Sequence, residues 1–174
     1  METGSLKDKL LKLYDFSNET PTASAFIQAR DKIKAEAFKI LLDRFNQQTH
    51  KDKLYKGYRL LAIDGSELPI DNTIYDKETT LLRRSRTNKP YSAYHITASY
   101  DLLECTYDDL IIQGEAMKDE NDAFCQLVDR YKGRKSIFIA DRNFESYNGF
   151  AHVAFSGHKY LIRVKDIGSR TSIT

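Results

Sequence analysis

The first fifty residues carry apolar side chains at helical spacing. One stripe of leucine and tyrosine runs over residues 6–14, and a second apolar stripe runs over residues 26–45. The polar segment 17–22 separates the two stripes, and the polar segment 46–53 follows the second. Recurrence at every third or fourth position is typical of amphipathic helices. The pattern therefore predicts an N-terminal helical segment over residues 1–50.

After residue 55 the pattern changes to short apolar runs, which predict buried strands. Residues 58–63 (YRLLAI) form one run and lead into a predicted turn that begins at Asp64. Residues 136–140 (SIFIA) form a second run, which leads directly to Asp141. Between them, apolar side chains alternate over residues 94–100, as they do in a strand. Both buried runs thus end at an acidic residue.

Further strands and helices complete the pattern. A strand is expected over residues 110–113, a helix over 123–131, a helix over 147–155 with aromatic end residues on its apolar side, and a last strand over 160–164. The closing strand–helix–strand unit favours parallel pairing through a right-handed crossover, whereas the earlier hairpins favour antiparallel pairing. The expected fold class is α/β, with a mixed sheet flanked by helices in a domain over residues 55–174.

Composition narrows the class of protein only slightly. The chain has 174 residues, 41% of them hydrophobic and 30% charged, which is typical of one globular domain. No apolar run is long enough to cross a bilayer and no signal peptide is recognisable, so a cytoplasmic location without a membrane partner is expected. The net charge of +2 is too small to indicate nucleic-acid binding by itself. Cys105 and Cys125 are expected to be reduced thiols.

Asp64 and Asp141 are the residues that carry candidate chemistry. In open α/β sheets, ligands collect at the carboxyl ends of strands, so neighbouring strands would bring both carboxylates to one edge. Two close carboxylates repel each other, and a divalent cation relieves that repulsion. Hard carboxylate oxygens suit Mg²⁺ or Mn²⁺, and such ions can promote phosphodiester cleavage. An Asp-Gly-Ser sequence is also a common turn, so spacing alone leaves both interpretations open.

Five segments resemble, in the same order, segments of DDE-type transposases of bacterial insertion sequences. The branch meant is the insertion-sequence family numbered four. The motifs LLAIDGSELPI and IFIADRNFESYNGF resemble its first-aspartate and second-aspartate motifs. The resemblance covers about residues 24–165, and its segments are 24–38, 60–70, 94–114, 137–150 and 159–166.

The resemblance implies an RNase H-like fold and a metal-dependent enzyme acting on DNA. Asp64 and Asp141 would be the first two members of the family's acidic triad, both catalytic and both metal ligands. The implied cofactor is Mg²⁺ or Mn²⁺, and the implied partner is double-stranded DNA, both transposon ends and target. The implied assembly is a homodimer on paired ends. Water would cleave at the element end, and the freed 3′ hydroxyl would then attack the target.

The third acidic residue of that family is missing from its expected pattern. The family carries it within Tyr-x2-Arg-x3-Glu-x6-Lys, and two Tyr-x2-Arg pairs occur here, but Phe138 and Ile167 stand at the glutamate position. Asn143 and Phe144 also replace the common glycine and tyrosine of the second motif. We therefore expect a C-terminally truncated copy with weak metal binding and little strand cleavage. The alternative is an inactive remnant that acts at most as a DNA-binding or dimerising fragment.

A phosphohydrolase with an aspartyl nucleophile is a third interpretation of the first strand end. Such enzymes usually carry Asp-x-Asp at this place, whereas Ser66 stands at the second position here. A GxxxxGK phosphate-binding loop is absent as well. Both observations argue against this class.

Basic residues near the two motifs are candidates for binding DNA. Phosphate contacts from arginine and lysine dominate the affinity of proteins for DNA. Four lie in the polar segment 71–90, which is predicted to be a loop, and a fifth follows the second aspartate. A solvated loop or a structural ion pair is the competing interpretation. The five candidates are Arg83, Arg84, Arg86, Lys89 and Arg142.

Overall fold

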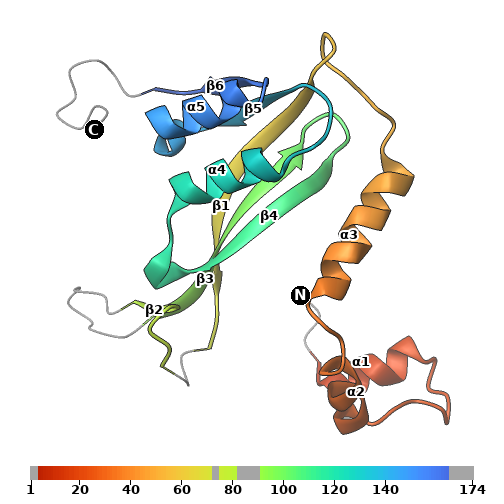
Figure 1. Cartoon of the computed structure of the whole chain (residues 1–174). Coiled ribbons are helices and arrows are strands. Elements are labelled where there is room, and N and C mark those ends of the chain that lie inside the picture. Colours follow the sequence, from red (N-terminus) through yellow and green to blue (C-terminus); the bar gives the residue numbers. More distant parts are fainter. Residues whose placement is uncertain (1–3, 72–74, 82–90, 165–174) are drawn as a thin grey trace. The chain divides into compact units, whose positions relative to one another are not determined.

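The computed structural model describes residues 4–71, 75–81 and 91–164 (Figure 1). The chain divides into two compact units, Met1–Phe45 and Asn46–Thr174. Four of the candidate DNA-binding residues, between positions 83 and 89, lie outside the described residues. Within the described part, no helix combines the length and apolarity needed to cross a membrane.

Helices make up most of the N-terminal unit. Helix α1 (Leu6–Leu13) begins with a capping box, in which Ser5 and Asp8 each accept a hydrogen bond from the other's backbone N–H. Helix α2 (Ala23–Arg30) precedes α3 (Glu36–Thr49), which continues into the second unit. The expectation of one helix over residues 26–45 is wrong, because the backbone leaves the helix after Arg30. Apolar spacing continues through that break and therefore does not reveal it.

A six-stranded mixed sheet is the centre of the second unit. Strand β1 pairs in parallel with β5, and β5 pairs in parallel with β6; β1 and β3 are antiparallel, as are β3 and its two other neighbours, β2 and β4. This confirms the expected α/β fold, an RNase H-like mixed sheet flanked by helices. The strands are β1 (Arg59–Pro69), β2 (Thr80–Leu81), β3 (Tyr91–Asp101), β4 (Thr106–Gly114), β5 (Ser136–Ala140) and β6 (Lys159–Ile162).

Two crossover helices give the parallel strands their direction (Figure 1). A 3-10 turn η1 (Glu115–Met117) and helix α4 (Glu120–Arg130) connect β4 to β5. A second 3-10 turn η2 (Arg142–Phe144) and helix α5 (Tyr147–Phe155) connect β5 to β6. Asp119 caps α4 by accepting a hydrogen bond from the backbone N–H of Asp122. Parallel strands need crossovers of this kind, so the helices fix the sheet order beside β1.

The hydrophobic core lies between these helices and one face of the sheet. Phe124 and Val128 of α4 pack with Leu61 of β1 and Phe138 of β5 in one buried cluster. Helix α5 contributes Val153 to the same cluster. The expectation that aromatic end residues form the apolar side of α5 is wrong, because Tyr147 is 69% exposed and Phe155 is 92% exposed. The small residues Gly149 and Val153 face the core instead.

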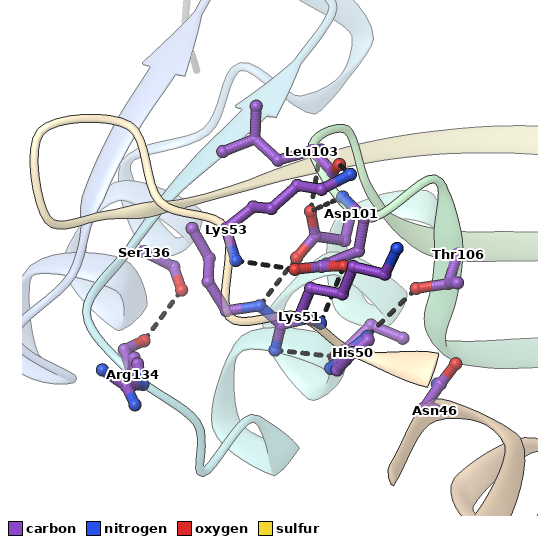
Figure 2. A network of polar contacts seen from close by, with 12 residues as sticks. Asn46, His50, Lys51, Lys53, Asp101, Leu103, Thr106, Arg134 and Ser136 are labelled. Carbon is purple, nitrogen blue, oxygen red and sulfur yellow. Dashed lines mark hydrogen bonds and ion pairs between the residues drawn. The ribbon is translucent and has the colours of Figure 1, made fainter. Parts of the chain in front are cut away.

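A buried ion pair holds the start of β1 against the end of β3. Arg59 Nε lies 2.7 Å from Asp101 Oδ2, and the Asp101 side chain is fully buried. Asp101 Oδ1 also accepts hydrogen bonds from the backbone N–H groups of Leu103 and Glu104. Figure 2 shows this carboxylate within a larger polar network that reaches Lys51 and Lys53. One aspartate thus fixes both the β3–β4 turn and the entry to β1.

The same turn binds the segment that precedes β1. Glu104 accepts hydrogen bonds from the backbone N–H groups of Lys51 and Lys53, at 3.1 and 2.6 Å. These hydrogen bonds lower the pKa of Glu104 below its usual value, and the bond from Lys53 has the larger effect. His50 contacts Thr106 Oγ1 at 3.1 Å. The segment before β1 is therefore tied to the sheet by side chains of the β3–β4 region (Figure 2).

Candidate functional site

Asp64 and Asp141 lie next to each other across two parallel strands. The register of β1 and β5 pairs Ile63 with Ala140, and each aspartate is the next residue of its strand. Leu61 and Ile63 face the core, so alternation places Asp64 on the opposite face of the sheet. Asp141 has an extended backbone and follows the same alternation. The structure thus places Asp64 and Asp141 at the same end of two neighbouring strands and on the same face of the sheet, and both residues are exposed.

One oxygen of each carboxylate is held by a nearby backbone amide. Asp64 Oδ1 accepts a hydrogen bond from Gly65 N–H at 2.9 Å. Asp141 is the N-cap of η2, and its Oδ1 accepts a hydrogen bond from Asn143 N–H at 2.8 Å. Among the described residues, no hydrogen bond involves the second oxygen of either carboxylate. The arrangement leaves one hard oxygen on each side chain for a cation.

The first aspartate does not end its strand, contrary to the expectation of a turn. Strand β1 continues to Pro69, and Asp64 to Pro69 pair with Ala98 to Ala93 of β3. Strand β3 is 11 residues long and provides the hydrogen-bonding partner for this extension. Tertiary pairing therefore overrides the local turn preference of Asp-Gly-Ser. The pairing of β1 with β5 ends at Ile63, and this end places Asp64 beside the second aspartate.

The second aspartate follows the end of its strand, as the sequence predicts. Strand β5 ends at Ala140, and Asp141 begins the 3-10 turn that leads to α5. Arg142, the remaining candidate for DNA binding, is the first residue of this turn and is exposed. Phe144, which replaces the tyrosine of the resembled motif, is 2% exposed and packs in the core. Burial of this ring anchors the turn, so that Asp141 and Arg142 are held at the surface.

A buried polar cluster next to Gly65, on the opposite face of the sheet from the Asp64 side chain, was not found by reasoning from the sequence. His95 of β3 is 3% exposed, and its ring nitrogens lie 3.3 Å from Glu115 and 3.1 Å from Glu120. Lys118 Nζ lies 2.7 Å from the other oxygen of Glu115, and this contact raises the pKa of Lys118. One signal was available: a histidine alternates with threonine and serine on one side of an otherwise apolar strand.

The chemistry of the aspartate pair fits a divalent cation with water and phosphate as its other ligands. Carboxylate oxygens are preferred by Mg²⁺, which often binds through one or two carboxylates and substrate phosphates. Within the described residues, no group of three or more histidine, cysteine, aspartate or glutamate residues forms a metal site. The described part of the chain therefore offers a two-carboxylate site and no complete acidic triad.

Comparison with known proteins agrees with this geometry. Residues 55–171 match the family described as the transposase DDE domain. The match contains both aspartates, the whole sheet and both crossover helices. No similar protein was found among curated proteins. Because the match covers more than half of the chain, the chain belongs to the transposase DDE domain family.

Proposed function

We propose that this chain is a transposase of the insertion-sequence family numbered four, in which Asp64 and Asp141 bind the divalent cation. The observation that carries the proposal is the pairing of Ile63 with Ala140, which makes the two aspartates neighbours at one sheet edge. Hydrogen bonds from Gly65 and Asn143 orient the carboxylates before a cation arrives. Such preorganisation reduces the reorganisation needed on binding.

The reaction proposed is phosphodiester cleavage followed by strand transfer. When bound, Mg²⁺ or Mn²⁺ supplies neutralisation of phosphate charge and activation of an attacking water. The role of Asp64 and Asp141 is to hold that charge at the place where the scissile phosphate binds. Arg142 adjoins Asp141 on an exposed turn, so its guanidinium is placed to contact a phosphate of the bound strand. A homodimer on paired transposon ends is the expected assembly.

A non-catalytic DNA-binding protein is the second candidate. The spacing Tyr-x2-Arg-x3-Glu-x6-Lys, which carries the third acidic residue in related transposases, does not occur in the 174 residues. Two carboxylates bind a divalent cation more weakly than three, because fewer charged ligands offset the loss of its water shell. We therefore expect DNA binding that weakens with salt, together with little cleavage by the chain alone.

The two candidates differ in metal-dependent cutting of DNA. We expect incubation with supercoiled plasmid and Mn²⁺ to produce little nicking, whereas electrophoretic shifts of DNA weaken as salt rises. Mn²⁺ binding, measured by electron paramagnetic resonance, is expected to fall at least about tenfold in Asp64→Asn and Asp141→Asn. Asp52→Asn, an exposed aspartate away from the site, is the matched control.

The nicking result distinguishes the two candidate functions, and the Mn²⁺ result tests the proposed metal site. Robust nicking that Asp141→Ala abolishes would show that the chain cuts DNA by itself and would overturn the expectation of weak activity. Mn²⁺ binding equal in Asp64→Asn, Asp141→Asn and Asp52→Asn would contradict the proposed metal site. Loss of Mn²⁺ binding in the two site variants alone supports it.

A further inference from the structure

His95 lies directly beneath the backbone that carries Asp64. A Cβ atom at Gly65 would come within 2.7 Å of His95 Nε2 and 3.0 Å of His95 Cε1. The same atom would come within 3.1 Å of Glu120 Oε1. Real Cβ contacts essentially never approach as closely as 2.7 Å. The His95 imidazole and the Glu120 carboxylate therefore leave no room for a side chain at Gly65. Only glycine fits at this position without movement of the cluster.

Acidic side chains of two elements approach the ring nitrogens of the imidazole. Glu115 of η1 and Glu120 of α4 face its two ring nitrogens at ion-pair distance, without the alignment of hydrogen bonds. Glu67 of β1 is the register partner of His95 on β3. Lys118 approaches Glu115 from the loop that leads to α4. The ring is thus held between acidic groups of fixed secondary structure.

The cluster reaches Asp64 through one peptide group. His95 and Glu120 occupy the space into which a side chain at Gly65 would extend, while the Gly65 N–H donates to Asp64 Oδ1 at 2.9 Å. Asp64 itself points to the opposite face of the sheet, so it makes no direct contact with the imidazole in this arrangement. We propose that His95, held by Glu115 and Glu120, is a positioning residue that fixes the Gly65 amide and thereby the Asp64 carboxylate. This inference rests on the proposed metal site.

A purely structural role would not require a histidine at this place. An apolar side chain fills a buried strand position without the desolvation that the buried Glu115 and His95 require. Buried polar groups are tolerated where their arrangement is needed. Here the cluster lies where β1 continues beyond its pairing with β5. It lies against Gly65, the residue directly after Asp64. Support for Asp64 accounts for both the polar character and the location.

The test compares single and double variants of the whole chain with two readouts. One readout is hydrogen exchange of the Gly65 amide by nuclear magnetic resonance, and the other is Mn²⁺ affinity by electron paramagnetic resonance. We expect His95→Ala to speed exchange at Gly65 and to weaken Mn²⁺ binding by about tenfold. Gly65→Ala is expected to weaken Mn²⁺ binding similarly, because its methyl group displaces the peptide from the imidazole.

The double variant tests whether the two residues act through each other. In Gly65→Ala combined with His95→Ala, the methyl group occupies space that the imidazole has left. The loss of Mn²⁺ affinity should then be clearly smaller than the product of the two single losses. Ser99→Ala is the matched control, because Ser99 is buried on the same face of β3 but pairs with Ile63 rather than with the site.

Outcomes for the proposed positioning role and for the proposed function are distinguishable. Unchanged Gly65 exchange and unchanged Mn²⁺ affinity in a folded His95→Ala variant would overturn the positioning role. If that variant does not fold, Glu120→Gln decides in its place, since it keeps the shape of Glu120 and removes its charge. If Asp64→Asn leaves Mn²⁺ binding intact, the proposed metal site fails, and Gly65 exchange alone decides whether His95 holds the peptide.

Discussion

Replacing Asp101 with alanine is expected to lower the free energy of unfolding by about 3–5 kcal/mol. The Asp101 side chain is fully buried and lies 2.7 Å from Arg59 Nε. Its removal leaves a guanidinium that is 12% exposed without its closest counter-charge. Two backbone N–H groups of the β3–β4 turn, from Leu103 and Glu104, lose their acceptor as well. Urea unfolding followed by circular dichroism measures the loss.

Neighbouring charges explain why Asp101 contributes more to stability than Asp108, the other acidic residue near Arg59. Burial lowers the pKa of Arg59, but Asp101, Tyr131 and Asp108 raise it by more, so the pair favours the charged guanidinium. Burial raises the pKa of Asp108 above its usual value, although Arg59 acts in the opposite direction. The Asp108 carboxylate is thus a costly charge, and Asp108→Asn is expected to destabilise much less than Asp101→Ala. Equal losses in the two variants would contradict this ranking.

Replacing Phe138 with alanine is expected to lower the free energy of unfolding by about 3–5 kcal/mol. Phe138 is 1% exposed at the centre of β5, the strand that carries Asp141. Its ring makes edge contacts with Phe124 and Tyr131, at centroid distances of 6.3 and 5.8 Å. The substitution leaves a cavity among side chains of α4 and the sheet, and these contacts are lost.

Phe155→Ala is the matched control, because it removes the same ring from a position that is 92% exposed. It is expected to change stability within about 0.5 kcal/mol. Urea unfolding of both variants tests the assignment of the core. Similar losses in both variants would mean that Phe155 is buried in solution or that β5 is not central to the fold.

The elements that the sequence predicted well are those whose signal is local. Residues 136–140 are apolar throughout and end at Asp141, and the structure has a strand at that place. Alternation over residues 94–100 predicted β3, although the buried side of that strand carries polar residues such as His95 and Thr97. Alternation defines a strand but does not decide which face is buried, because that depends on what packs against it.

The features that the sequence did not reveal depend on distant partners. Strand β1 extends beyond Asp64 because β3 provides pairing partners, and those lie about thirty residues further along the chain. Gly65 was assigned to a turn, whereas its small size is needed for contact with His95 and Glu120. The adjacency of Asp64 and Asp141 was a conditional expectation, and the parallel register of β1 and β5 supplies the missing condition. Tertiary pairing decides all three.

The sharing of one cation by Asp64 and Asp141 can be tested by anomalous X-ray scattering from crystals of the chain grown with MnCl₂. We expect an anomalous peak on the exposed face of the sheet, about 2.1 Å from an oxygen of each carboxylate. The peak should be absent in crystals of Asp141→Asn. Crystals that diffract well but have no peak at this edge, or a peak bound by one aspartate alone, would contradict a shared metal site.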